Sequence, residues 1–226
     1  MNEYQKYWFF MLLILLSFSL LEASCTSNPP ALDNQPPVSV PVPRDNTGFI
    51  SDKPATSSSG EITFPIDQAL SRVTKKTFGL HVSPGHSPIF PERFTGYHTG
   101  VDFETFPSEQ NEDIVIRSIC TGPLMLKKWG TGYGGVAVQQ CQLKKQTVTL
   151  IYGHLKFESI RTPIQAIIQS GEQIGILGKG FSHETDGERK HLHLAIHRGS
   201  EIDIRGYVAT PTELSGWIDP LQYFER

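Results

Sequence analysis

The most constraining feature of this sequence is a run of strict alternation near its C-terminus, residues 191–197 with the sequence HLHLAIH. The Leu and Ile residues of the run share one parity, and its three histidines share the other. A period of two predicts a half-buried β-strand with one apolar and one polar face. On such a strand His191 and His193 project from the same face, about 6–7 Å apart. Because imidazole is both a metal ligand and a proton carrier, one histidine can bind a metal while the other catalyses. The alternative is an exposed histidine-rich face.

Length and composition describe one main domain with additional segments. The chain has 226 residues, of which 38% are hydrophobic and 19% are charged, which is compatible with a globular core. The formal net charge of -3 leaves no basic excess. Because nucleic-acid binding needs clustered Lys and Arg side chains, we expect no nucleic-acid partner.

The N-terminal residues resemble an export signal. Residues 8–21 read WFFMLLILLSFSLL, an apolar run that is too short for an ordinary membrane span and fits a secretory signal. Small residues precede Cys25, as in the cleavage box of bacterial lipoproteins, although Glu22 stands where an aliphatic residue is usual. We expect residues 1–25 to be a signal peptide or lipoprotein signal, so that the protein is exported to the periplasm or cell envelope. The alternatives for processing are a lipid on Cys25, ordinary cleavage after Ala23, and an uncleaved short anchor.

The segment that follows, residues 26–60, is predicted to be a flexible linker. It contains paired prolines and a Ser-Ser-Ser-Gly run, and it has little to bury. We expect it to hold a domain comprising residues 61–226 away from a membrane or wall. An inert disordered tail is the alternative interpretation.

Beyond residue 60 the pattern predicts a mainly β domain. Apolar and β-branched runs alternate with glycine-rich turns, as is typical of antiparallel strands. The segments 84–91 and 199–216 are expected to be irregular, and 67–75 to be a short helix or irregular. The expected strands are residues 113–120, 124–129, 136–143, 147–153, 173–178 and 191–197.

Two of the three cysteines lie within the predicted domain. Cys120 and Cys141 fall on expected strands on either side of the glycine-rich turn 130–135. They could lie opposite each other in the sheet, close enough to bridge. Because export permits oxidation, we expect a Cys120–Cys141 disulfide, with two buried thiols as the alternative.

Further donor side chains lie upstream of the histidine pair. His98 and Asp102 have the spacing His-x-x-x-Asp, and His154 ends a predicted strand. A zinc hydrolase needs three protein ligands and an open position for water, and imidazole and carboxylate suit zinc. Each residue alone is a weak signal, because His98 could cap a turn, Asp102 could accept backbone N–H groups, and His154 could be a core histidine.

Together and in this order, the motifs resemble one family, the lysostaphin/LytM-type zinc endopeptidases that cut peptidoglycan peptides. The resemblance covers residues 64–226, approximately the whole predicted domain. It is carried by HTGVDF at 98–103, GGVAV at 134–138, YGHL at 152–155, Gly171 with IGILG at 174–178, HLH at 191–193 and DPL at 219–221.

The resemblance implies a mechanism and a substrate. One Zn²⁺ ion would be bound by His98, Asp102 and His193, and His154 and His191 would be metal-free catalytic histidines that bond the attacking water and the tetrahedral intermediate. The implied fold is an antiparallel β-sandwich or half-barrel with a metal-containing groove. The implied substrates are stem or cross-link peptides of peptidoglycan.

The sequence also departs from the family pattern. The loop 182–190 is longer and more charged than usual, Leu194-Ala195 replaces the usual Phe-Glu, and 199–216 resembles an insertion beside the groove. These departures remove no expected ligand, but they leave the cleaved cross-link open. The other histidines of the domain are expected to be surface or structural residues, namely His81, His86, His183 and His197.

Two other functions are compatible with the same residues. The first is a non-hydrolytic or autoinhibited envelope module that binds peptidoglycan or activates other wall hydrolases. The second is an exported protease acting on other proteins. The presence of all five expected site residues favours an active peptidoglycan endopeptidase.

Overall fold

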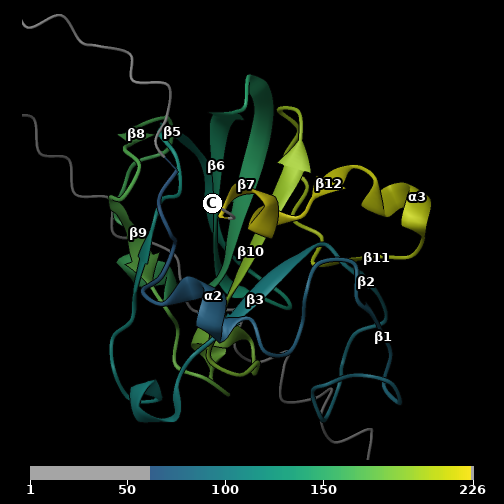
Figure 1. Cartoon of the computed structure of the whole chain (residues 1–226). Coiled ribbons are helices and arrows are strands. Elements are labelled where there is room, and N and C mark those ends of the chain that lie inside the picture. Colours follow the sequence, from purple (N-terminus) through teal and green to yellow (C-terminus); the bar gives the residue numbers. More distant parts are fainter. Residues whose placement is uncertain (1–61, 225–226) are drawn as a thin grey trace, which may run out of the picture. The chain divides into compact units, whose positions relative to one another are not determined.

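An antiparallel sheet of seven strands forms the centre of the domain (Figure 1). The description rests on a computed structural model in which residues 62–224 are described. The expected signal segment, the linker and Cys25 lie outside these residues. The strand order is β12-β10-β7-β6-β5-β8, and β3 pairs with β10 beside this path. The prediction of a mainly β, antiparallel fold is confirmed.

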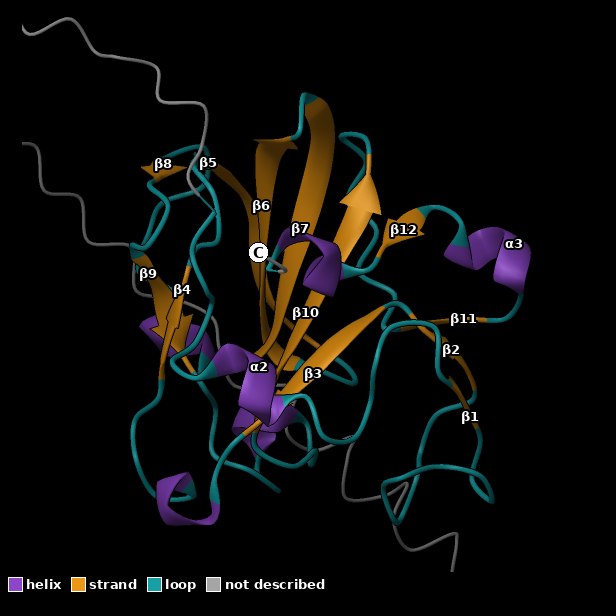
Figure 2. Ribbon diagram, in the orientation of Figure 1, coloured by secondary structure: helices purple, strands orange, loops and turns teal. Residues whose placement is uncertain are grey.

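The helices are single turns, and strands make up most of the ordered structure (Figure 2). Among residues 62–224, none of the helices combines the length and the apolar character needed to cross a membrane. The strands are β1 (His81–Val82), β2 (Gly96–His98), β3 (Gly100–Glu104), β4 (Val115–Arg117), β5 (Gly122–Gly130), β6 (Gly134–Leu143), β7 (Gln146–Leu155), β8 (Ile167–Ile168), β9 (Gln173–Ile176), β10 (His191–Arg198), β11 (Tyr207–Val208) and β12 (Trp217–Ile218). The helices are α2 (Ala69–Arg72), α3 (Pro211–Leu214) and the 3₁₀ turns η2 (Pro107–Glu109), η3 (Phe157–Ser159), η4 (His183–Thr185) and η5 (Pro220–Tyr223).

The main core lies on one face of the large sheet. Alternate residues of the long strands contribute to it, including Leu150 and Tyr152 of β7 and Leu192 and Leu194 of β10. The small β4–β9 sheet and α2 supply further members of the same cluster, such as Ile116. The apolar parity of residues 191–197 therefore faces the core, as the alternation predicted.

The opposite face of β10 is also buried, which corrects the prediction of a half-buried strand. The residues His191–Ile196 are all buried, histidines included. A second apolar cluster covers this face, with Tyr133, Ala195 and Trp217 among its members. A single-sequence pattern reports the polarity of a face but not whether other segments cover it.

The structure differs from the prediction in two segments, one expected to be irregular and the other expected to be a strand. The segment 199–216 contains β11 and α3, and α3 begins with a capping box in which Thr210 and Glu213 bond each other's backbone N–H groups. The expected strand 113–120 is limited to β4, so Cys120 lies in a bend before β5 and not on a strand.

The predicted disulfide between Cys120 and Cys141 is present. It links the bend before β5 to β6, and both cysteines are buried. Next to it, the buried side-chain amide of Gln139 donates to the carbonyls of Cys120, Gly122 and Ile168. A disulfide of this kind fits an extracytoplasmic protein, because the cytosol keeps thiols reduced.

We expect reduction of this disulfide to destabilise the domain. The bridged residues are 21 positions apart, and closing a loop of that length in the unfolded chain contributes about 3 kcal/mol of stability. Urea unfolding followed by circular dichroism, with and without reductant, measures the difference. The Cys120→Ala/Cys141→Ala variant serves as the control, because its stability should not respond to reductant. Identical urea midpoints for the oxidised and reduced parent protein would contradict the expectation.

Candidate metal centre

Three buried donor atoms converge at the start of β10. They are Nε2 of His98 on β2, Oδ1 of Asp102 on β3 and Nδ1 of His193 on β10. The two nitrogens are 3.0 Å apart, Oδ1 lies 3.2 Å from Nε2 of His98, and it lies 3.1 Å from Nδ1 of His193. Among residues 62–224 this is the one group of three or more His, Cys, Asp or Glu side chains arranged to hold a metal ion.

Strand pairing brings these side chains together. β3 and β10 pair antiparallel, with Asp102 opposite His193. The glycine at position 100 is required by this close approach, because a Cβ there would lie 2.4 Å from the carbonyl oxygen of Leu194 and 2.9 Å from Cε1 of His193. The His-x-x-x-Asp spacing spans the short turn from β2 into β3 and places His98 beside the pair.

The ring of His98 is oriented by a backbone carbonyl. Its Nδ1 lies 3.1 Å from the carbonyl oxygen of Thr77, which can only accept, so Nδ1 is a donor and Nε2 is the atom that faces the other two donor side chains. Nε2 lies 3.2 Å from Oδ1 of Asp102 and 3.0 Å from Nδ1 of His193. Ligands around tetrahedral zinc, at about 2.0–2.1 Å from the metal, are about 3.3 Å apart. The observed spacings of 3.0–3.2 Å therefore fit a zinc-sized ion.

The two oxygens of Asp102 have different partners. Oδ1 faces the two histidine nitrogens, whereas Oδ2 accepts from Nη2 of Arg189 at 2.7 Å and lies 3.3 Å from Nε2 of His191. Burial alone would raise the pKa of Asp102, but the neighbouring His191, His98 and Arg189 hold it well below its ordinary value. The carboxylate is therefore ionised and ready to bind a metal.

His154 and His191 stand beside the three donors. Their ring centroids are 4.2 Å apart. His154 adopts a left-handed backbone with φ of 61°, an unusual conformation for a residue other than glycine. Its Nδ1 is buried without a hydrogen-bond partner, and burial holds its pKa well below the ordinary value. The residue therefore combines a strained backbone with a neutral imidazole whose Nδ1 has no hydrogen-bond partner among the described residues.

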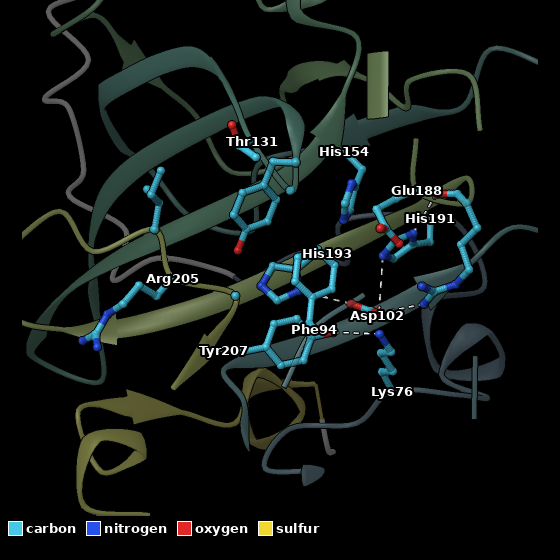
Figure 3. A pocket seen from close by; sticks show the side chains of 15 residues that line it. Lys76, Phe94, Asp102, Thr131, His154, Glu188, His191, His193, Arg205 and Tyr207 are labelled. Carbon is cyan, nitrogen blue, oxygen red and sulfur yellow. Dashed lines mark hydrogen bonds and ion pairs between the residues drawn. The ribbon is translucent and has the colours of Figure 1, made fainter. Parts of the chain in front are cut away.

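Asp102, His154, His191 and His193 line a pocket of about 340 Å³ (Figure 3). His98 is not part of the lining but contacts His193. In Figure 3, His191, His193 and Asp102 lie close together, and His154 approaches His191. The walls are aromatic. Phe94 stacks on Tyr207 with ring centroids 5.1 Å apart, and Tyr133 packs against Gly153, where a Cβ would come within 2.4 Å of the ring. The hydroxyl of Tyr133 and Nε2 of His193 are buried and unpartnered.

The sequence pattern identified the five residues that meet here, but not the residues that hydrogen-bond to them or pack against them. His81, His86 and His183 are exposed, and they lie outside the cluster of donors together with His197. The supports that were missed are Arg189, Glu104 and Tyr133. The parity of the sequence contained a signal for two of them, because Arg189 precedes His191 by two positions and Glu104 follows Asp102 by two.

Comparisons with known proteins were made on sequence and on structure. No family model matches the chain, and no curated protein sequence matches it. Solved structures do match. The catalytic domain of the antimicrobial peptidase lysostaphin from Staphylococcus simulans is 19% identical, with 72% of this chain and 100% of that chain covered and a TM-score of 0.49. The structure of LytU is 18% identical, with 67% and 83% covered and a TM-score of 0.46. A zinc-containing peptidase from Vibrio cholerae is 18% identical, with 59% and 35% covered and a TM-score of 0.38.

The chain therefore matches lysostaphin, LytU and related peptidase catalytic domains in structure, at low sequence identity. The resemblance expected from the motifs is confirmed at that level. What the chain itself shows is a buried His98–Asp102–His193 set consistent with a metal site.

We expect the metal-free protein to lose stability as the pH falls from about 6.5 to about 4. Burial lowers the pKa of His193 from 6.5 to about 4, so in this range the unfolded chain binds a proton that the folded chain does not. The stability that depends on a neutral His193 is fully present above pH 6.5 and is lost as the pH falls to 4. For His193 this loss in the free energy of unfolding is about 3 kcal/mol. Urea unfolding of chelator-treated protein across this range measures it. In the His193→Gln variant, the slope of the unfolding free energy against pH should fall by the amount that one bound proton contributes. An unchanged slope would refute the assignment.

Proposed function

We propose that the protein is an exported zinc metalloendopeptidase that hydrolyses peptide bonds in the stem or cross-link peptides of peptidoglycan. The observation that carries the proposal is the convergence of two imidazole nitrogens and one carboxylate oxygen within 3.2 Å of one another. This donor set, with His98, Asp102 and His193 as ligands, suits zinc and leaves one position open. The motif resemblance supplies the substrate class.

The chemistry of zinc in such a site is well defined. When bound, the ion supplies Lewis acidity that makes a water acidic near neutral pH and polarises a peptide carbonyl. Asp102 contributes one negative charge to balance the ion, and the carbonyl of Thr77 holds the His98 ring in the tautomer that a ligand requires.

His154 and His191 are proposed to move the protons. Nδ1 of His191 donates to the carbonyl oxygen of Arg189 at 2.9 Å, which orients the ring, and Nε2 faces the site 3.3 Å from Oδ2 of Asp102. Nε2 is the atom proposed to exchange a proton with the attacking water. His154, whose ring is adjacent, has an unpartnered Nδ1 that can donate a hydrogen bond to the developing oxyanion. The proton that the water gives up to this pair of histidines is passed to the leaving amine. The aromatic walls around Phe94, Tyr133 and Tyr207 limit access of bulk water to these steps.

The proposed location follows from the disulfide and the N-terminal sequence. Cys120–Cys141 fits an oxidising compartment, and residues 1–25 resemble an export signal. We infer a periplasmic or cell-envelope protein whose linker, residues 26–60, positions the domain at the wall. A lipid on Cys25 would anchor it to the membrane.

We expect purified protein loaded with Zn²⁺ to release peptides from isolated peptidoglycan. His191→Ala and His154→Ala should each lower the rate by about 10²–10⁴-fold, because each removes a proton carrier. Asp102→Asn and treatment with a chelator should abolish cleavage through loss of the metal. Mass spectrometry of the released fragments identifies the bond that is cut.

The matched control is His86→Ala, which changes an exposed histidine away from the site and should leave the rate unchanged. If the parent and His191→Ala released peptides equally, the catalytic assignment would fail. Binding to peptidoglycan without cleavage would favour the non-hydrolytic module instead. Cleavage of casein-like proteins in preference to cross-link peptides would favour a general exported protease.

A further inference from the structure

A buried arginine, Arg189, hydrogen-bonds the oxygen of Asp102 that does not face His98 and His193. Arg189 lies in the loop just before β10, and its Nη2 donates to Oδ2 of Asp102 at 2.7 Å. The same guanidinium donates to both carboxylate oxygens of Glu104, through Nε at 3.0 Å to each and through Nη2 at 2.5 Å to Oε1. Arg189 is 8% exposed and Glu104 is 9% exposed. The charge of Arg189 is therefore paired with these two carboxylates and is largely shielded from solvent.

Glu104 occupies a position equivalent to that of Asp102. The two residues are two apart on β3, so their side chains project from the same face of the strand. In the β3–β10 register, Asp102 lies opposite His193 and Glu104 lies opposite His191. Directly opposed residues have Cβ atoms about 4.5–5.5 Å apart. A second carboxylate thus stands one step along the strand from the metal position, next to a proposed proton carrier.

We propose that Arg189 is a positioning residue that sets the composition of the metal centre. It holds Oδ2 of Asp102, so that only Oδ1 faces His98 and His193. It also holds both oxygens of Glu104, so that this carboxylate stays out of the metal's coordination. The inference rests on the metal site of the proposed function and adds to it the reason why the site has three protein ligands and one open position.

The chemistry of the side chain explains why an arginine serves here. Its planar fork presents several N–H donors in fixed directions, and it can bond two carboxylates at once while remaining charged. The attraction of Asp102 and Glu104 raises the pKa of Arg189 in spite of the opposing effect of burial. A lysine offers one compact charge and could not hold both carboxylates in these orientations.

The test uses Co²⁺ as a probe, because four-coordinate Co²⁺ absorbs visible light more strongly than five- or six-coordinate Co²⁺. We expect Arg189→Gln to bind Co²⁺ with weaker visible absorption than the parent, since Glu104, then held only by the exposed Lys75 at 3.3 Å, joins the coordination. In the Arg189→Gln/Glu104→Gln double variant the extra carboxylate is gone and Asp102 is no longer held, so Co²⁺ affinity should fall about 10–100-fold. Metal-buffered titration of the full chain gives both the affinity and the spectrum.

The control is the Arg72→Gln/Glu109→Gln double variant. Arg72 is also buried and bonds both oxygens of Glu109, at 2.6 and 2.7 Å, and it meets the site only through the backbone carbonyl of Glu104. Both double variants remove one cation and one anion, so the net charge is unchanged, but only the Arg189→Gln/Glu104→Gln variant also takes a partner from the buried Asp102. Circular dichroism verifies that both variants fold. We expect the control to bind Co²⁺ within about threefold of the parent and with the same spectrum.

The outcomes separate this inference from the proposed function. A parent protein that binds no Co²⁺ overturns both. A parent that binds Co²⁺ while Arg189→Gln keeps the parent affinity and spectrum overturns the role of Arg189 alone. An equal loss of affinity in the two double variants also overturns it, because the effect would then belong to any buried arginine–glutamate pair.

Discussion

The pairing of β3 with β10 is the interaction on which the site depends. It places Asp102 opposite His193 although the two residues are 91 positions apart in the chain. Because side chains alternate between faces, a shift of one residue in this register would turn His191 and His193 into the core and Leu192 out of it. The apolar parity of β10 opposes such a shift, since Leu192 and Leu194 pack in the main cluster. Core packing and the metal centre are thus specified by the same register.

The centre concentrates polar groups in a region that excludes water. Burying an ionised carboxylate and several imidazoles is unfavourable unless each gains a partner. Some partners are within the chain, such as the carbonyl of Thr77 for His98 and the guanidinium of Arg189 for Asp102. Within the cluster, Nδ1 of His193 lies within hydrogen-bond distance of both Oδ1 of Asp102 and Nε2 of His98. A divalent cation bound there would take the place of these contacts, which would link stability to metal binding.

The segments that depart from the motif pattern form the walls of the site. The loop 182–190 supplies Glu188 and Arg189, and the segment 199–216 supplies residues 204–207 of the pocket lining. The glycine-rich turn between β5 and β6 supplies Tyr133, which the absence of a side chain at Gly153 allows to pack over the sheet. Parts of the chain for which the motifs make no prediction therefore shape the pocket.

The sequence by itself determined the strand character of residues 191–197, the identity of the five polar side chains and the pairing of two cysteines. These follow from local periodicity, from donor chemistry and from a small number of combinations. Only the tertiary structure decided that both faces of β10 are buried, that Cys120 lies outside a strand, and that Arg189 bridges Asp102 and Glu104. The Arg189 bridge joins residues 85 and 87 positions apart, and the cover of β10 comes from Tyr133 and Trp217 on other elements. No local pattern encodes which distant segment will cover a face or neutralise a charge.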